Sequence, residues 1–196
     1  MVASVLVVCR ANQGRSPVLA ELLRLQAARM DADVQVTSSG LEAQPGMPVL
    51  PAMTKAWRHR GYGGFYHASR GFDAKEARLA ELTLVFEAAQ RSRIVNEVPA
   101  LVGQVFTVRE ATRLISSPRW DPAWAGSSFV MTRLHRLRGY VEPADDDTPD
   151  PARMRRAACA RLLTELERSA QLIGEALFTP RDGSGPHSSS SSTTSP

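Results

Sequence analysis

The sequence predicts an α/β fold built on an open, mostly four-stranded parallel sheet with helices on both faces. Short apolar runs rich in β-branched residues alternate along the chain with segments of helical spacing. Such alternation is typical of parallel sheets, which are covered on both sides by the helices that connect their strands. The length agrees, because 196 residues with 43% hydrophobic content are enough for one domain with a substantial core.

Four segments are predicted to be strands, because each is short, rich in β-branched residues and ended by turn residues. They are residues 4–8, 33–40, 81–86 and 103–108. Three segments between them, residues 16–30, 49–61 and 73–82, have helical spacing. The last of these begins at Asp73, an N-cap candidate with Glu76 three residues later, which is the pattern of a capping box. A long amphipathic helix over residues 151–177 closes the domain.

The domain is expected to span residues 1–178. Residues 179–196 contain no apolar side chain to bury and are expected to form a disordered tail. Residues 116–148 combine a turn-rich start, a basic amphipathic piece and an acidic end. We expect this segment to be an insertion that carries one short helix around residues 128–137.

The charge and cysteine content limit the class of protein. The net charge is +4, and nearly all the positive charge is arginine, since Lys55 and Lys75 are the only lysines. This excess favours anionic partners such as phosphate but is too scattered to indicate nucleic acid. No apolar run is long enough for a membrane span and no secretory signal is visible, so a cytoplasmic protein away from the membrane is expected. We also expect a monomer. Two cysteines do not suggest a disulfide framework.

The stretch that carries chemistry lies between the first predicted strand and the first predicted helix. Cys9 ends the strand, at the edge where open α/β sheets bind ligands. The five residues after it form a loop whose N–H groups point inward, and Pro17 suits the first turn of the helix that follows. The positive helix N-terminus attracts an anion and stabilises a cysteine thiolate.

Arg15 can hold two phosphate oxygens in a bidentate manner, and the hydroxyl of Ser16 can donate to the sulfur. A cysteine after a strand is more often only a small buried residue. The joint pattern of strand, Cys, five residues, Arg, Ser, Pro and helix nevertheless favours a phosphate-binding loop after the first strand. The residues predicted to bind phosphate are Arg10, Ala11, Asn12, Gln13, Gly14, Arg15 and Ser16.

The stretch VLVVCRANQGRSP resembles the signature of the low-molecular-weight protein tyrosine phosphatases. VTSSGLEAQPGMPVLPAM is similar to the family's second strand and the Gly-Pro-rich loop after it, HASRGF to its His-x-Ser-Arg segment, and LTLVFEAAQRSRIV to the next strand and helix. The resemblance implies a hydrolase that acts on a phosphotyrosine-containing protein or an aryl phosphate and releases inorganic phosphate. It implies no cofactor, and the four histidines suggest no metal site because none clusters with a cysteine. The residues implied to hold the loop in shape are Asn12, Ser16, Ser38 and His67.

The general acid has two candidates, each in an Asp-Pro pair. An acid that protonates a leaving phenolate accelerates the reaction by a factor of about 10² to 10⁴. Asp121 is flanked by Trp120 and Trp124, and Asp150 stands in the run DTPDP. The family places its acid in an Asp-Pro loop shortly before the last helix, which favours Asp150 and keeps Asp121 as the alternative.

Two departures from the family stand out. Ala152 follows the Asp-Pro pair where the family usually has an aromatic residue, so Trp124, Tyr140 or another residue of the insertion would have to form the aromatic wall. Gly14 stands where many members have a cysteine, so an oxidised Cys9 would lack a resolving thiol in the loop.

The expected reaction has two steps. The Cys9 thiolate attacks phosphorus while Asp150 protonates the leaving phenol, and Asp150 then activates water to hydrolyse the phosphocysteine. The alternative function is a phosphate-binding or phosphotyrosine-binding regulatory module with little turnover, which would result if the acid loop were displaced from the site.

Overall fold

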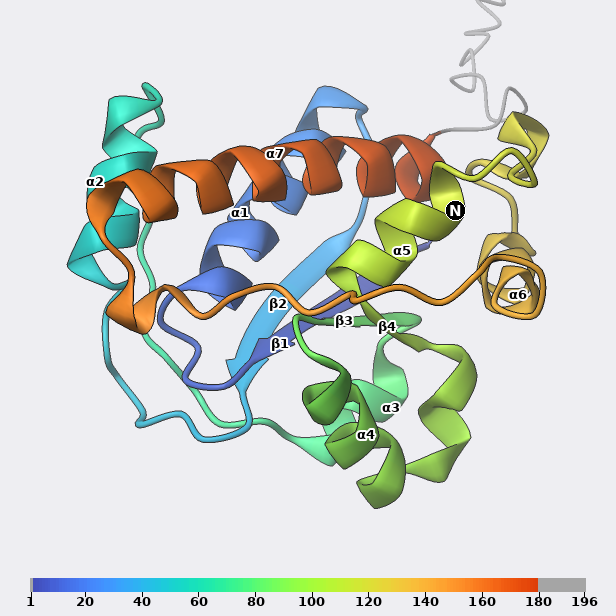
Figure 1. Ribbon diagram of the computed structural model, residues 1–196, viewed down its shortest axis with the longest axis horizontal. Coiled ribbons are helices and arrows are strands. Elements are labelled where there is room, and N and C mark those ends of the chain that lie inside the picture. Colours follow the sequence, from blue (N-terminus) through green and yellow to red (C-terminus); the bar gives the residue numbers. More distant parts are fainter. Residues whose placement is uncertain (1, 180–196) are drawn as a thin grey trace, which may run out of the picture.

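The computed structural model describes residues 2–179, and its centre is a parallel sheet of four strands (Figure 1). The strands are β1 (Ser4–Cys9), β2 (Gln35–Gly40), β3 (Leu82–Val85) and β4 (Val105–Thr107). Their order is β2-β1-β3-β4, and each neighbouring pair is parallel. The predicted fold class is therefore confirmed. Of the predicted tail, all but Thr179 lies outside the described residues.

Helices cover both faces of the sheet (Figure 1). One face packs against α1 (Arg15–Arg29), α2 (Pro51–His59), α5 (Val108–Ile115), α6 (Val130–Leu137) and α7 (Arg156–Phe178). The other face is covered by α3 (Ala74–Leu79), α4 (Ala88–Glu97) and the 3₁₀ turn η1 (Pro99–Gly103).

Strand β1 shows why the sheet needs both layers. Val5 and Val7 belong to the core under α1 and α7, whereas Leu6 and Val8 belong to the core under α3 and α4. Side chains of a strand alternate between faces, so a continuous apolar run fits a strand that is buried on both sides. Cys9 ends this strand on the α1 side.

One predicted boundary and one predicted cap differ from the structure. The strand predicted over residues 103–108 ends at Thr107, whose side chain accepts the Glu110 N–H while Glu110 reaches back to Thr107, and this capping box starts the unpredicted helix α5. Asp73 caps α3 as expected, but through the Lys75 N–H, and Glu76 instead binds Arg70 and Thr37. The capping box predicted there is therefore absent.

The closing helix also starts later than predicted. Pro151–Arg153 forms a separate 3₁₀ turn, η3, and the backbone of Met154 and Arg155 is extended before α7 begins at Arg156. The helix packs against α1, α2 and α5 along its length. This break separates the Asp-Pro pair from the helix, so the pair sits in a turn beside the sheet edge.

Residues 116–148 contain the short 3₁₀ turn η2 (Pro122–Trp124) and α6, the one short helix predicted there. After α6 the chain returns as an extended segment, residues 141–150, which we call the strap. The strap crosses in front of α5 toward the carboxyl end of the sheet (Figure 1). Its Thr148 N–H donates to the Phe86 carbonyl, at 2.7 Å, just after β3. The end of this segment is therefore part of the sheet edge where the loop after β1 lies.

Over residues 2–179, no helix combines the length and the apolar character that crossing a membrane would require.

Candidate active site

The loop between β1 and α1 has its carbonyl groups turned outward. Four of them accept hydrogen bonds from donors outside the loop. The pairs are Cys9 O with Leu41 N–H (3.0 Å), Arg10 O with Glu42 N–H (2.8 Å), Asn12 O with His67 Nε2 (2.6 Å) and Gln13 O with Leu50 N–H (2.7 Å). In a trans peptide the carbonyl and the following N–H point in opposite directions. The N–H groups of Arg10, Ala11, Gln13 and Gly14 therefore face the interior of the loop, where they form an anion-binding concavity.

Asn12 holds the loop in this shape. Its φ of 54° lies in the left-handed region, which Asn tolerates better than most residues. Its Nδ2 donates to Ser16 Oγ at 2.9 Å and to Ser38 Oγ at 3.0 Å, and its Oδ1 accepts the Arg70 N–H at 3.0 Å. With His67 on the Asn12 carbonyl, the structure brings together all four residues predicted to support the loop.

Cys9 points its sulfur toward hydrogen-bond donors. The Sγ lies 3.0 Å from Ser16 Oγ and accepts the Asn12 N–H at 3.3 Å. The Ser16 hydroxyl accepts from Asn12 Nδ2 and has one proton to donate, for which the Ser39 carbonyl at 3.3 Å and the Cys9 sulfur at 3.0 Å are the two acceptors. Helix α1 also begins at Arg15, so its N-terminus faces the loop. These donors and the helix end direct positive partial charge at the sulfur.

The second cysteine is unrelated to this chemistry. Cys159 is fully buried in α7, and burial raises the pKa of its thiol. It packs in the core as a small apolar residue.

Arg15 is the largest buried polar side chain next to the loop, with only 1% exposed. Its Nη1 donates to Glu87 Oε1 and to the Thr148 carbonyl, both at 2.6 Å. Its guanidinium also lies 5.4 Å from the centre of the Phe86 ring. A buried charge requires such partners, so Glu87 and Thr148 fix the guanidinium where it can meet a bound phosphate.

Sequence reasoning missed Glu87 and Thr148. An acidic residue two positions after β3, at the carboxyl end of a strand next to β1, could have indicated Glu87. The backbone carbonyl of Thr148 carries no such signal, because its position depends on the path of the strap.

Asp150 stands at the mouth of the loop. Its Oδ2 lies 3.4 Å from Arg15 Nη2 and 3.1 Å from Arg10 Nη2. Its Oδ1 accepts the Ala152 N–H at 3.0 Å, which orients the carboxylate. About a third of the side chain remains exposed (34%), so substrate and water can reach it. The structure thus brings Cys9, Arg15 and Asp150 to one site.

Asp121 makes the same local turn but lies elsewhere. Its Oδ1 accepts the Ala123 N–H at 2.9 Å, and the nearby Gly126 N–H donates to the Ala176 carbonyl near the last turn of α7. Asp150 precedes the first turn of α7. At 1.5 Å per residue, the helix separates its two ends by about 30 Å. The structure therefore does not bring Asp121 to the loop.

The two aromatic residues proposed to replace the usual wall are also remote. Trp124 stacks edge-on against Trp120 in this distant segment, and Tyr140 lies beside Arg119. The side chains that flank the loop at Gly14 are instead Leu50 and Pro151. The expectation that Trp124 or Tyr140 lines the site was wrong, because the segment after η2 is bound near the last turn of α7 and α6 packs against α5 and η1.

Gly40 is a further site residue that the sequence did not indicate. A Cβ at this position would lie 2.7 Å from both Arg10 O and Asn12 N, so the backbone of the phosphate loop rests directly on Gly40. Only glycine allows this close approach. The residue pairs with Cys9 in the parallel register, which places it beside the sulfur-bearing end of β1.

Comparisons with known proteins agree with this geometry. The model of the family described as low molecular weight phosphotyrosine protein phosphatase matches residues 4–121, a range that includes the loop but ends before Asp150. Two probable low molecular weight protein-tyrosine-phosphatases named EpsP, from Ralstonia nicotianae and Ralstonia solanacearum, are 33% identical over 110 residues. That alignment covers 56% of this chain and 73% of each relative.

Solved structures share the fold. The tyrosine phosphatase Wzb from Escherichia coli K30 in complex with sulphate is 21% identical, with a TM-score of 0.67 over 89% of this chain and 98% of that one. The tyrosine phosphatase AmsI from Erwinia amylovora is 22% identical, with a TM-score of 0.67 over 90% and 94%. The YwlE arginine phosphatase from Geobacillus stearothermophilus is 20% identical, with a TM-score of 0.66 over 88% and 91%.

Proposed function

This chain belongs to the low molecular weight phosphotyrosine protein phosphatase family and is a cysteine-dependent phosphatase, and we propose that Cys9, Arg15 and Asp150 carry out its reaction on phosphotyrosine and other aryl phosphate monoesters. The observation that carries this proposal is the position of the Asp150 carboxylate, 3.4 Å from the buried guanidinium of Arg15 at the mouth of the loop. A nucleophile, an anion cradle and a proton donor thus lie around one concavity.

The first step transfers the phosphoryl group to the enzyme. The substrate phosphate occupies the loop, where the inward N–H groups and Arg15 stabilise its equatorial oxygens. The Cys9 sulfur uses its electron pair to form an S–P bond as the P–O bond to the phenol breaks. Asp150 donates its proton to the leaving oxygen, so that a neutral phenol departs.

The second step releases inorganic phosphate. Asp150, now a carboxylate, accepts a proton from a water that attacks phosphorus, and the S–P bond breaks with its electron pair returning to Cys9. The Ser16 hydroxyl, 3.0 Å from the sulfur, stabilises the departing thiolate. The same carboxyl group thus serves as acid and then as base.

The alternative function, a binding module with little turnover, depended on a displaced acid loop. The contacts of Asp150 with Arg10 and Arg15 favour the enzyme instead. We also propose that the protein acts as a cytoplasmic monomer, with a phosphotyrosine protein as its substrate. The two unpaired thiols support a reducing compartment.

Steady-state kinetics of active-site variants test this mechanism. The substrates are a phosphotyrosine peptide, p-nitrophenyl phosphate, whose leaving group needs less help from an acid, and a phosphoarginine peptide, because one structural neighbour is an arginine phosphatase. Cys9→Ser should abolish turnover of all three. Asp150→Asn should lower kcat on the phosphotyrosine peptide by about 10² to 10⁴ and affect p-nitrophenyl phosphate much less. Phosphotyrosine should be the preferred peptide.

Asp121→Asn is the matched control, because it removes the same charge from the same kind of Asp-Pro turn at the other end of α7. Its kinetics should equal those of the wild type. Wild-type activity in Asp150→Asn would disprove the assigned acid. A wild type that binds the phosphotyrosine peptide and turns over no substrate would restore the binding module.

A further inference from the structure

The charges of the chain are distributed unevenly around the phosphate loop. Residues 43–72 contain no Asp or Glu but four Lys or Arg, and residues 151–164 contain no Asp or Glu but four Arg. These two stretches include α2 and the first turns of α7. In the whole chain, 22% of the residues are charged and 20 are Asp or Glu, so two stretches of this length without any acidic residue are unusual.

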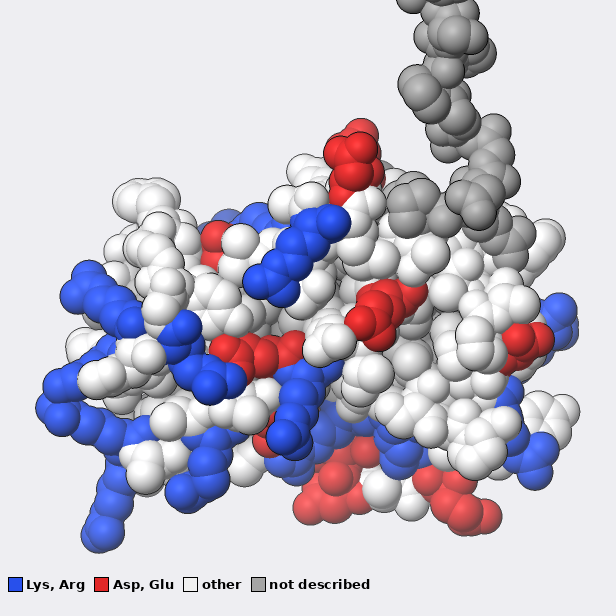
Figure 2. Space-filling view, turned by 90° about the horizontal axis from the view of Figure 1, so that it is seen from above, with Lys and Arg blue, Asp and Glu red and all other residues white. Residues whose placement is uncertain are grey.

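The fold joins the two stretches into one surface. Helix α2 packs against α7, and the exposed side chains of Lys55, Arg58, Arg155 and Arg156 belong to this part of the molecule. We call them the basic face. Lys and Arg gather over this end in the space-filling view, at the left of Figure 2, where α2 and the start of α7 lie in Figure 1.

These four side chains are not neutralised by the protein. Within residues 2–179, none of them forms an ion pair, whereas the neighbouring Arg60 is paired with Glu167. An unpaired cluster of like charges costs some stability through repulsion, which a ligand of opposite charge relieves.

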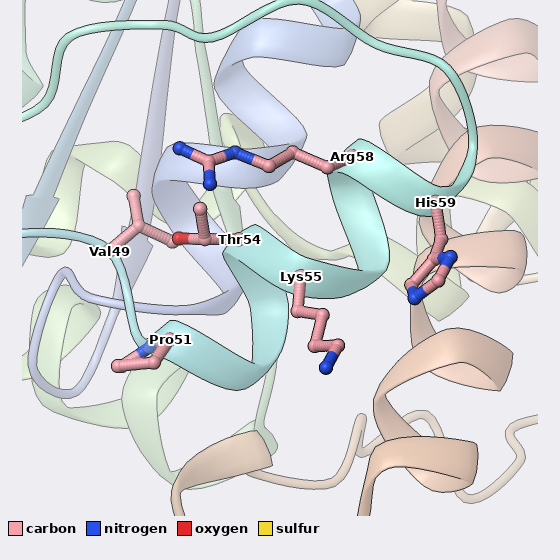
Figure 3. Close-up of a pocket in the computed structure, with 6 residues that line it drawn as sticks. All are labelled: Val49, Pro51, Thr54, Lys55, Arg58 and His59. Carbon is pink, nitrogen blue, oxygen red and sulfur yellow. The ribbon is translucent and has the colours of Figure 1, made fainter.

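The face also has hollows that can receive a ligand. A pocket of about 640 Å³ lies along α2 and is lined by Val49, Pro51, Thr54, Lys55, Arg58 and His59. The guanidinium of Arg58 reaches back toward Thr54 and Val49, whereas Lys55 and His59 point away from it (Figure 3). A second hollow of about 260 Å³ brings Lys55 and His59 together with Arg156 of α7. Both helices therefore contribute charge to one continuous surface.

The pocket begins next to the phosphate loop. Leu50, just before α2, donates its N–H to the Gln13 carbonyl at 2.7 Å. Lys55 follows Pro51 by four residues, about 6 Å along the helix. An extended peptide advances about 3.3 Å per residue. A side chain within about four residues of a phosphotyrosine in the loop can therefore reach the basic face.

The charges on other sides of the mouth are paired within the protein. Glu42, whose N–H donates to the Arg10 carbonyl, forms an ion pair with Arg93, and Asp150 pairs with Arg10 and Arg15. An acidic ligand therefore finds unpaired positive charge on the side of α2. We propose that the basic face binds an acidic segment of the substrate polypeptide, within about four residues of the phosphotyrosine. This inference rests on the proposed function and specifies its substrate class.

Paired peptides and paired variants test it. Two phosphotyrosine peptides of equal length are compared, one with Asp and Glu on both sides of the phosphotyrosine and one with Gln and Ser there. Lys55→Gln/Arg58→Gln is the test variant. Lys75→Gln/Arg136→Gln is the control, because it removes the same two charges from exposed positions on α3 and α6.

The wild type should prefer the acidic peptide, and the test variant should lose about tenfold in kcat/KM on it, mainly through KM. The loss should shrink at high salt, and kcat/KM on p-nitrophenyl phosphate should stay unchanged. The control variant should retain the preference.

Three outcomes would overturn the inference while leaving the phosphatase intact. These are equal kcat/KM for the two peptides in the wild type, an equal loss in test and control variants, or binding of the basic face to phosphatidylserine vesicles without any peptide preference. Failure of the wild type to hydrolyse any aryl phosphate would instead contradict the proposed function.

Discussion

At the scale of single residues, Gly14 shows how a missing Cβ shapes the site. A Cβ on Gly14 would lie 2.7 Å from Cγ of Pro151, a ring atom that cannot swing away, and 3.3 Å from Leu50. Pro151 follows the proposed acid Asp150 directly. In the sequence, Gly14 was notable only because it stands where many family members have a cysteine. The structure adds a steric feature of this chain, because Pro151 lies so close to the loop that its present position leaves no room for a Cβ on residue 14.

Gly14→Ala is therefore expected to push Pro151, and with it Asp150, away from the loop. Kcat on a phosphotyrosine peptide should fall about tenfold or more, since displacement of a catalytic group by about 1 Å can cost that much or more. The loss on p-nitrophenyl phosphate should be smaller. Gly64→Ala is the control, because a Cβ there meets only open space. Equal losses on the two substrates would show that the loop itself, and not the acid, had moved.

At the scale of elements, the strap is positioned by side chains instead of regular structure. Arg113 of α5 binds Asp146 with two nitrogens and donates to the Glu142 carbonyl at 2.7 Å. Asp147 accepts the Ala88 N–H at 2.7 Å, at the start of α4. Helices α5 and α4 thus hold the segment that delivers Asp150 to the loop.

Removal of one of these anchors should separate catalysis from phosphate binding. Arg113→Gln removes the contacts of α5 with the strap, so the position of Asp150 over the loop should become less well defined. Because the rate depends on the geometry of catalytic groups, kcat on a phosphotyrosine peptide should fall several-fold. The inhibition constant of inorganic phosphate should change little, because the loop stays intact. Arg138→Gln removes a comparable ion pair, with Glu110 of the same helix, away from the strap. If the two variants behave alike, the effect is one of general stability, which their Tm values will also show.

The elements that could be predicted from the sequence are those whose signals are local. The strand, loop and helix over residues 4–29 form one continuous stretch, so the phosphate loop followed from spacing alone. Helix α5 was not predicted, although Thr107 and Glu110 form a capping-box pattern. The apolar run of β4 leads directly into this pattern, so the start of the helix was interpreted as the end of the strand. The contact of Asp150 with Arg15 could not be derived locally, since it depends on anchors on α4 and α5.

At the scale of the whole molecule, His67 links the loop to the pH dependence of stability. Its pKa is lowered from 6.5, chiefly by burial, against the opposing effect of its hydrogen bond to the Asn12 carbonyl. The neutral ring donates Nε2–H to that carbonyl. The unfolded chain therefore binds a proton at a higher pH than the folded one. The stabilisation is complete above pH 6.5 and is lost as the pH falls from there toward the lower folded pKa.

Denaturant unfolding across this range tests the linkage. His67→Gln keeps a donor for Asn12 but does not titrate, so the decline in the free energy of unfolding below pH 6.5 should become shallower. Some decline should remain, because the pKa of His135 is also lowered, by burial and by Arg138. An unchanged slope in His67→Gln would contradict the linkage.

The long path of the chain between the halves of the site affects how the protein is made. Arg15 and the Thr148 carbonyl that holds it are 133 positions apart, and α7, which covers α1, comes later still. During synthesis on the ribosome, the loop with Cys9 therefore emerges long before Asp150, before the Thr148 carbonyl that binds Arg15, and before helix α7, which packs on α1. Contacts so distant in sequence form late in folding. A nascent or truncated chain that ends before the strap contains Cys9 and Arg15 but lacks the Thr148 carbonyl and Asp150, so we expect activity to begin only when the last helix has packed.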